Sequence, residues 1–451
     1  MKLKVIGGGL AGSEAAWQAA KWGMDVELYE MRPKQSTGAH HTGNLAELVC
    51  SNSLGSNLTN RASGLLKAEL RRMGSLLIEC ADQSAVPAGA ALAVDRELFS
   101  SCVQTKIMQH PNIKIIREEV TQLPDPPAVI ATGPLTSERF SQAIQNLTDE
   151  EHLFFFDAIA PIVAFDSINM DIAYRGNRYD RGETEEGDYI NCPLNTEEYL
   201  RFREALLSAE RIPLKSFETT IEQGVDAGEG AYFQGCQPVE IIAGQGERAF
   251  AFGPLRPVGL TDPRTGRWPF AVVQLRQDNL TGDLYNMVGF QTNLRYSEQD
   301  RVFRLIPGLE NAKFERYGHM HRNIFISAPK LLNSNLAMKN LPGLFVAGQL
   351  AGIEGYAGNI ASGLIAGKNA ARFIRNLPGL DLPLTTMTGA LIHYVTHAEI
   401  KSFQPMKAIF GLLPKPEDNQ KRSKRDRFEF YAQRALKDLN RYLEEMNIGS
   451  I

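Results

Sequence analysis

The stretch "KLKVIGGGLAGSEAAWQAAKWGMDVELYEMRP", residues 2–33, decides the fold of this chain. It begins with a short apolar strand over Leu3–Ile6 that runs into a glycine turn. An alanine-rich helix follows to about Lys21, and a second strand over Val26–Tyr29 ends at Glu30. A strand, a helix and a strand in this order and at this length predict a βαβ unit with parallel strands.

The glycine turn of this unit has the spacing of a dinucleotide-binding site. In the pattern GxGxxG the first glycine permits a tight turn, the second lets backbone approach a pyrophosphate, and the third lets helix and strand pack closely. Glu30 stands 18 residues after Gly12, where its carboxylate can accept hydrogen bonds from ribose hydroxyls. The residues expected to hold the cofactor here are Gly7, Gly8, Gly9, Leu10, Ala11, Gly12, Glu30 and Arg32.

A second strand–glycine–helix element favours FAD over a nicotinamide cofactor. Residues 341–375, "LPGLFVAGQLAGIEGYAGNIASGLIAGKNAARFIR", return to the style of the N-terminus, and flavoproteins of this architecture wrap their long cofactor between two such elements. "AVIATG" at 128–133 fits the same plan. Glu30 also disfavours NADP here, because it would repel a 2′-phosphate. The further expected cofactor contacts are Thr132, Gly133, Gly348, Gln349 and Gly352.

The segment between these elements has a different character. From about 150 to 325, strands such as "APIVAFD" and "FAVVQLR" alternate with Gly/Pro turns and with helices such as "NTEEYLRFREALLSAE". We predict an α/β fold: a Rossmann-like FAD-binding domain of the glutathione-reductase type, with an inserted α+β substrate domain. The expected FAD-binding parts are residues 1–150 and 326–451, the latter with terminal helices, and the insertion is 151–325.

The composition is that of an ordinary soluble globular protein, with 43% hydrophobic and 22% charged residues and a formal net charge of −4. No signal peptide or long apolar run is present, so no membrane association is expected. The five cysteines are widely spread without a CxxC pair, which argues against a disulfide framework and against a metal site. We expect a cytoplasmic monomer.

Two cysteines stand in polar loops. Cys50 lies in "AELVCSNSLGS" and Cys236 in "GAYFQGCQPVEIIA". A thiolate near a base or a positive charge is a strong nucleophile, but the pattern alone favours a small buried side chain for either cysteine. Cys80, Cys102 and Cys192 receive no functional assignment, and Cys102, within the helical pattern "RELFSSCVQTKIM", is expected in the core.

Several longer motifs resemble one family. They include "VIGGGLAGSEAAWQ", "YEMRP", "AELVCSNSL", "GDYINCPL", "FQGCQPVE", "FGPLRPVGL", "YNMVGFQT" and "FQPMKAIFGLLP", which together run from residue 3 to about 414. The chain is thereby similar to the bacterial flavin- and folate-dependent tRNA uracil-5-methyltransferases. The resemblance implies that methylenetetrahydrofolate donates one carbon, that reduced FAD carries it and supplies the electrons, and that NADH or NADPH re-reduces the flavin. The implied acceptor is C5 of the T-loop uridine, tRNA position 54.

The resemblance also implies roles for the two loop cysteines. It assigns attack on C6 of the uracil to Cys236, and a second catalytic role beside the flavin to Cys50. The chain departs from the family pattern at Lys407 and Ile409, where asparagines are usual, and in "EGYAGNIASG", which lacks a second glutamate. These departures put local flavin or folate contacts in doubt.

A tRNA substrate requires positive charge for its phosphates and an extruded base. The basic candidates are "KRSKRDR" at 421–427, the group Arg295, Arg301 and Arg304, and the group Arg316 and Arg322 with His319 and His321; each could instead be a solvated charged face. Three other functions stay open: a wobble-uridine modifying flavoprotein, usually a longer chain, a non-catalytic flavin-containing tRNA-binding protein, and a small-molecule FAD oxidoreductase.

Overall fold

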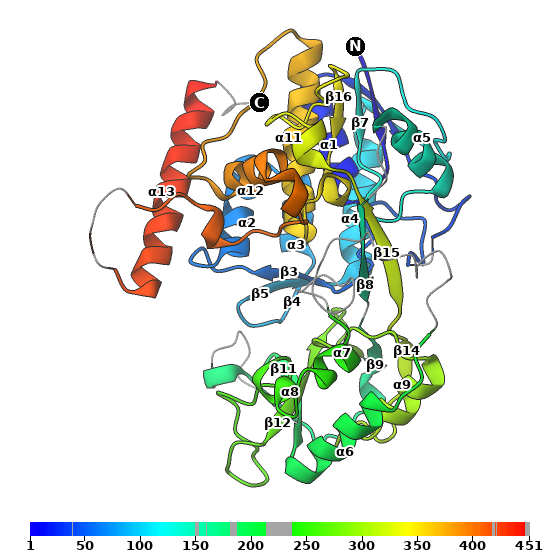
Figure 1. The fold of residues 1–451 in the computed structure, drawn as a ribbon, viewed down its shortest axis with the longest axis vertical. Helices are drawn as coiled ribbons and strands as arrows, with labels where there is room; N and C mark the ends of the chain where they lie inside the picture. Colours follow the sequence, from blue (N-terminus) through cyan, green and yellow to red (C-terminus); the bar gives the residue numbers. More distant parts are fainter. Residues whose placement is uncertain are drawn as a thin grey trace.

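The computed structural model describes residues 1–37, 39–148, 153–158, 160–180, 187–212, 237–416, 420 and 422–446. Figure 1 shows a larger body built from both ends of the chain and a smaller body built from its middle, joined by two long strands. The middle of the chain therefore leaves the larger body and returns to it.

A parallel sheet forms the centre of the larger body and confirms the predicted α/β fold. Its strand order is β16-β7-β1-β2-β6 and all neighbours run parallel. The predicted βαβ unit is confirmed as β1 (Lys2–Ile6), α1 (Leu10–Lys21) and β2 (Asp25–Tyr29). The other strands are β6 (Ile113–Ile116), β7 (Ala128–Ile130) and β16 (Leu344–Val346). Elements from both ends of the chain thus meet in one sheet.

Small residues allow the two alanine-rich helices to touch along their backbones. α1 packs against α11 (Tyr356–Ile374), and the two run side by side in Figure 1. A Cβ on Gly363 would lie 2.2 Å from the Ala11 carbonyl oxygen, and one on Gly367 would lie 2.4 Å from that of Ala15. Such distances exclude any side chain there, so the small residues set the spacing of the two helices.

The remaining helices of the larger body cover its faces and one side. They are α2 (Ala62–Arg72), α3 (Leu76–Gln83), α4 (Arg96–Gln109), α5 (Glu138–Thr148), α10 (Ala328–Leu331), α12 (Met387–His397) and α13 (Lys424–Glu445), with short turns η5 (Gly348–Ala351), η6 (Ile400–Ser402) and η7 (Phe410–Leu412). A small antiparallel sheet of β3 (Ser53–Ser56), β5 (Ala91–Val94) and β4 (Ala85–Val86) lies beside the smaller body (Figure 1).

The smaller body is built on an antiparallel sheet with its own apolar core. The strand order is β10-β11-β12-β13-β9-β14. The strands are β9 (Ile162–Ala164), β10 (Tyr174–Gly176), β11 (Tyr189–Leu194), β12 (Ala271–Gln277), β13 (Leu284–Met287) and β14 (Phe314–Arg316), with turns η1 (Phe165–Ser167) and η2 (Arg178–Asp180). Its helices are α6 (Thr196–Leu207), α7 (Val239–Gly244), α8 (Ala249–Phe252) and α9 (Tyr296–Phe303). Side chains such as Phe202, Phe250 and Phe290 fill a core that is separate from that of the larger body.

The two strands that join the bodies pair with each other. They are β8 (Leu153–Ala158) and β15 (Met320–Phe325), which are antiparallel and lie between the bodies in Figure 1. The predicted domain boundaries at 150/151 and 325/326 fall at the outer ends of these strands. The boundaries themselves stay a prediction.

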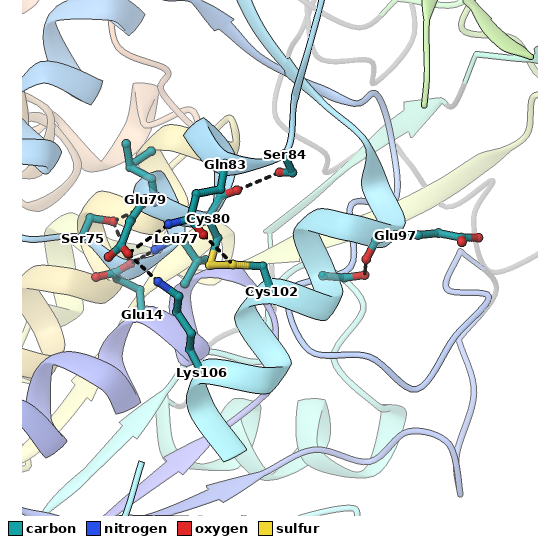
Figure 2. The surroundings of a disulfide bond; sticks show 12 residues. Glu14, Ser75, Leu77, Glu79, Cys80, Gln83, Ser84, Glu97, Cys102 and Lys106 are labelled. Atoms are coloured by element: carbon teal, nitrogen blue, oxygen red, sulfur yellow. Dashed lines mark hydrogen bonds and ion pairs between the residues drawn. A yellow bond between two sulfur atoms is a disulfide. The ribbon is translucent and has the colours of Figure 1, made fainter. Parts of the chain in front are cut away.

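The structure contains a disulfide, against which the wide spread of the cysteines had argued. Cys80 on α3 and Cys102 on α4 form a disulfide with a Cα–Cα distance of 5.8 Å, and Cys102 is half-buried, not fully enclosed in the core (Figure 2). The two helices pack side by side, and an ion pair between Lys106 and Glu79 also joins them. No local motif signals the pair, because the two residues lie 22 positions apart on separate helices.

Candidate functional site

A cleft opens at the carboxyl ends of β1, β2, β7 and β16, where α/β folds place their ligands. Ten of the thirteen residues expected to contact the cofactor line it: Gly7, Gly9, Leu10, Ala11, Glu30, Arg32, Thr132, Gly133, Gly348 and Gln349. Gly8, Gly12 and Gly352 lie behind the wall. The segments that form the wall come from both ends of the chain, which is the arrangement that a long dinucleotide needs.

The glycines of the turn divide into those that face the cleft and those that shape it. A Cβ on Gly9 would meet no atom within 4 Å, so the backbone there faces open space. A Cβ on Gly12 would lie 1.7 Å from the Gly7 carbonyl oxygen, and Gly7 itself has a φ of +103°. Gly9 is the N-cap of α1 and the first turn of that helix carries no acidic side chain. The cleft therefore offers a helix N-terminus to an anion such as a pyrophosphate.

Glu30 is held by Arg32 in the wall of the cleft. The Glu30 carboxylate accepts hydrogen bonds from the Gly8 N–H (3.0 Å) and from the Arg32 N–H (2.9 Å) and Nε (2.8 Å). Burial favours the neutral acid, but the Arg32 hydrogen bond and charge and the two backbone donors outweigh it, so the pKa of Glu30 lies below its usual value. Glu30 is thus an ionised acceptor at the place expected for a ribose, and Arg32 already shares its oxygens.

Several residues of the wall carry no signal in the glycine motifs. His40, Thr37 and Glu47 line the cleft after β2, and Tyr356 and Asn359 line it from the first turn of α11. Burial and the nearby Arg32 charge lower the pKa of His40 to about 4, so its imidazole is neutral at pH 7. The glycine pattern predicts where the pyrophosphate of the cofactor binds. These other side chains belong to segments whose path the pattern does not predict.

Cys50 is held by its backbone at the edge of this cleft. Its N–H donates to the Tyr356 hydroxyl (2.8 Å), and its carbonyl oxygen accepts from Nη2 of Arg96 (3.0 Å). Cys50 is half-buried, and Tyr356 is also part of the cleft wall. One tyrosine therefore contacts both the thiol loop and the expected cofactor site.

Residues of the smaller body form hydrogen bonds and an ion pair with the Cys50 loop and with Arg96, which contacts that loop. Arg96 is an ion-pair partner of Asp278, just after β12, with Nε 2.9 Å from Oδ2. Asn52 donates to the Gln277 carbonyl (2.9 Å) and accepts from Nε of Arg276 (2.9 Å). Burial disfavours the charge of Arg96, but Asp278 outweighs it, and the pKa of Arg96 is raised. The polar "CSNS" segment is thus a junction between the two bodies.

The remaining cysteines divide clearly. Cys236 lies outside the described residues, which resume at Gln237. Cys192 is fully buried in β11, where burial raises the pKa of its thiol and keeps it protonated. Among the described cysteines, Cys50 is therefore the one whose backbone is hydrogen-bonded to a residue of the cleft wall.

The three basic groups named from the sequence differ in their surroundings. Arg301 and Arg304 pair with Glu298 and Asp300, and Arg295 pairs with Glu210. Arg316 is half-buried and donates to the Ala39 carbonyl (3.0 Å), so it bridges the bodies. The side chains of Arg322 and His321 lie outside what is described, as does Lys421. The exposed Lys424, Arg425 and Arg427 at the start of α13 form no ion pair with any described residue.

Two departures from the family pattern, Lys407 and Ile409, lie apart from the cleft wall. Met406 forms a bridge with Ile353, so the segment after it passes the loop that leads to Tyr356. Lys407 is exposed, and Ile409 lines a separate groove beside α13. Within "EGYAGNIASG", where a second glutamate is missing, Tyr356 and Asn359 line the cleft itself. This motif is therefore the departure that lies within reach of a ligand in the cleft.

Two absences apply to the described ranges only. No helix there is both long and apolar enough to span a bilayer. No three His, Cys, Asp or Glu side chains there come together as a metal site would require.

Comparisons with known proteins agree with one another. The family model described as "Glucose inhibited division protein A" matches residues 2–378. A relative from Heliobacterium modesticaldum is 52% identical over 446 residues, which is 99% of this chain and 98% of the relative. One from Natranaerobius thermophilus is 53% identical over 445 residues, covering 98% and 99%. Both are named methylenetetrahydrofolate--tRNA-(uracil-5-)-methyltransferase TrmFO. Among solved structures, GidA of Aquifex aeolicus matches with a TM-score of 0.70 at 16% identity, covering 99% of this chain and 75% of that chain.

Proposed function

Because the chain belongs to the TrmFO family of methylenetetrahydrofolate--tRNA-(uracil-5-)-methyltransferases, we propose that it methylates C5 of the T-loop uridine at tRNA position 54. The carbon would come from methylenetetrahydrofolate, and FAD held by the cleft wall would supply the reducing electrons and carry the one-carbon unit, with NADH or NADPH as the source of those electrons. The expected site residues are those of the cleft wall together with Cys50 and Cys236.

The observation that carries this proposal is the contact between Cys50 and Tyr356. A thiol loop and a dinucleotide cleft could lie anywhere relative to each other, but here the Tyr356 hydroxyl accepts the Cys50 N–H at 2.8 Å while its side chain lines the cleft. Catalysis between a thiol and a cofactor requires such fixed proximity. The arrangement supports a reaction in which Cys50 acts next to the flavin.

The residues of this chain have separable tasks in that reaction. The α1 N-terminus and Gly9 receive the pyrophosphate of the cofactor, and ionised Glu30 faces its ribose. Arg96 and Tyr356 hold the backbone of Cys50 from opposite ends. In this proposal the Cys236 sulfur adds to C6 of the uracil, which makes C5 nucleophilic. Cys50 then accepts or relays the proton that leaves C5, and the S–C6 bond breaks as the C5–C6 double bond reforms.

The test supplies labelled methylenetetrahydrofolate, NADH and an unmodified tRNA transcript to the purified flavoprotein. Label in 5-methyluridine at position 54 is the expected product. Label at the wobble uridine would assign the chain to a different modification, and NADH oxidation that is indifferent to RNA would point to a small-molecule oxidoreductase.

Variants then separate the cysteines. Cys236→Ala and Cys50→Ala should each abolish methyl transfer while the flavin absorbance of the purified protein is kept. Cys192→Ala is the matched control, because its thiol is buried in β11 and away from the cleft, and it should retain activity. An active Cys236→Ala enzyme would remove the assigned nucleophile.

A further inference from the structure

A groove of about 1010 Å³ lies beside α13, on a part of the surface that the cleft does not use. We call it the α13 groove and define it by Ile409, Phe410, Lys415, Arg422, Arg427 and Phe428. It forms where the turn η7 meets the first turns of α13, the helix at the left of the larger body in Figure 1. Its wall thus combines apolar and cationic side chains.

The aromatic side chains of the α13 groove are stacked and only partly covered. The rings of Phe410 and Phe428 have centroids 4.5 Å apart at an interplanar angle of 30°, and Phe410 is 5.8 Å from the ring of Tyr431. Both phenylalanines are half-buried. A half-covered stack of this kind leaves a π-face to which a further flat ring can be added.

Three cationic side chains near this stack, those of Lys415, Lys424 and Arg427, form no ion pair with any described acid. Lys424 and Arg427 each lie 5.8 Å from the Phe428 ring centroid. The basic residues Arg295, Arg301 and Arg304 of the smaller body, by contrast, are all ion-paired. The charges of Lys415, Lys424 and Arg427 are therefore available to an external anion.

The segment that forms the groove is attached to the cleft. The Met406 N–H donates to the Gly352 carbonyl, and the Glu354 N–H donates to the Met406 carbonyl, both at 2.9 Å. Glu354 in turn accepts a hydrogen bond from Gln349 of the cleft wall (2.7 Å). A ligand in the α13 groove would therefore contact a segment that is hydrogen-bonded to the rim of the catalytic cleft.

We propose that the α13 groove binds unpaired nucleotides of the RNA substrate, with a base stacked on the Phe410–Phe428 pair and its phosphates on Lys424, Arg427 and Lys415. The proposal rests on the proposed tRNA function and names a second contact surface for that substrate. Aromatic rings beside Lys and Arg recognise single-stranded nucleotides, because every base has a π-face and every linkage a charge. A double-stranded segment would offer phosphates but no free base.

The test measures binding of two RNA probes to the holoenzyme by fluorescence anisotropy: a T-arm stem–loop and a fully paired duplex of equal length. Phe428→Leu keeps an apolar side chain but removes the ring. It should weaken stem–loop binding between about fivefold and a hundredfold and leave duplex binding unchanged. Phe428→Tyr retains the ring and should bind the stem–loop with the affinity of the wild type. If the ring had only a structural role, Phe428→Leu would weaken the binding of both probes.

Charge reversal tests the phosphate contacts. Lys424→Glu combined with Arg427→Glu should weaken both probes and lower the slope of log affinity against log salt by about 1.5. Lys437→Glu, an exposed lysine farther along α13 and outside the groove, is the matched control and should change neither quantity. Thermal melting checks that each variant is folded.

The outcomes separate this proposal from the proposed function. If the wild type methylates tRNA while the folded groove variants bind both probes like the wild type, the groove assignment is overturned and the methyltransferase function stands. If the wild type neither binds nor methylates tRNA, both are overturned. Loss of stem–loop binding in Phe428→Leu, with duplex binding kept, supports the groove.

Discussion

The glycine turn and the Cys50 loop lie at the same cleft but are built in different ways. The turn is held by neighbours in sequence: the Gly8 N–H reaches Glu30, 22 positions away, and Arg32 reaches Glu30 across two positions. The Cys50 loop is held by Arg96, Tyr356 and Gln277, which are 46, 306 and 225 positions from their partners in it. A site made of backbone geometry can be encoded locally, whereas a site made of converging loops requires the whole fold.

The largest effect should come from filling the space that the glycine turn needs. In Gly12→Ala the new Cβ would collide with the Gly7 carbonyl oxygen, which it would approach to 1.7 Å, so α1 cannot keep its distance from β1. We expect loss of FAD binding and of soluble folded protein, measured by flavin absorbance and gel filtration.

Gly9→Ala sharpens this prediction, because a Cβ there meets no protein atom within 4 Å. That variant should fold and yet bind FAD weakly, since its methyl group enters the space of the cofactor. Gly244→Ala, at the end of α7, has room for a methyl group and should be neutral. A normal flavin content in Gly12→Ala would contradict the close-packing argument.

The next largest effect, a loss of methyl transfer, should come from removing the contacts that position the Cys50 loop. Arg96→Leu removes the donor to the Cys50 carbonyl and leaves Asp278, which is 4% exposed, without its ion-pair partner. We expect methyl transfer to fall by about 100-fold, the scale of a misplacement near 1 Å, while FAD stays bound. Single-turnover methylation and flavin content measure the two effects.

Asp278→Asn offers a graded version of the same test, because it keeps an acceptor for Arg96 and should retain more activity than Arg96→Leu. The matched control is Arg71→Leu, which removes an exposed bidentate pair with Asp82 in the same body. Equal activity of Arg96→Leu and the wild type would show that the carbonyl contact does not position Cys50.

What could be predicted from the sequence follows the same division. The βαβ unit, the parallel sheet and the cleft wall formed by the two glycine elements were predictable, because glycine spacing reports backbone geometry directly. The contact of Tyr356 with Cys50 was not, since nothing local to "EGYAGNIASG" specifies which loop will lie against it. The same holds for the pairing of Cys80 with Cys102, which depends on how α3 packs against α4.

A smaller effect on the Cys50 loop should come from the disulfide behind it. Cys102 lies on α4, whose first residue is Arg96, and it joins that helix to α3 (Figure 2). Cys102→Ser should lower the free energy of unfolding by about 3 kcal/mol, the expectation for a closed loop of this size, and methyl transfer should stay within about twofold. The ion pair of Lys106 with Glu79 and the Asp95 N-cap remain to hold α4.

Urea unfolding of the variant and of the oxidised wild type measures this difference. In the presence of reductant the two proteins should agree, because both then lack the cross-link. A wild type whose stability is indifferent to reductant would show that the disulfide does not contribute. Unchanged activity in Cys102→Ser would also localise the grip on Cys50 to the first turn of α4.

The last prediction concerns the pH dependence of stability and His40, which lines the cleft. Burial and the Arg32 charge lower its pKa from an ordinary 6.5 to about 4. Between these values the unfolded chain binds a proton that the folded chain does not, so stability falls as the pH falls from 6.5 towards 4, by up to about 3 kcal/mol.

His40→Gln, which cannot be protonated, should flatten this part of the curve of unfolding free energy against pH. His110→Gln is the control, because burial alone lowers the pKa of His110, without a neighbouring arginine charge, and the variant should alter the slope less. If the two variants change the free energy of unfolding equally between pH 6.5 and 4, the buried His40 is not the group that makes stability fall with pH.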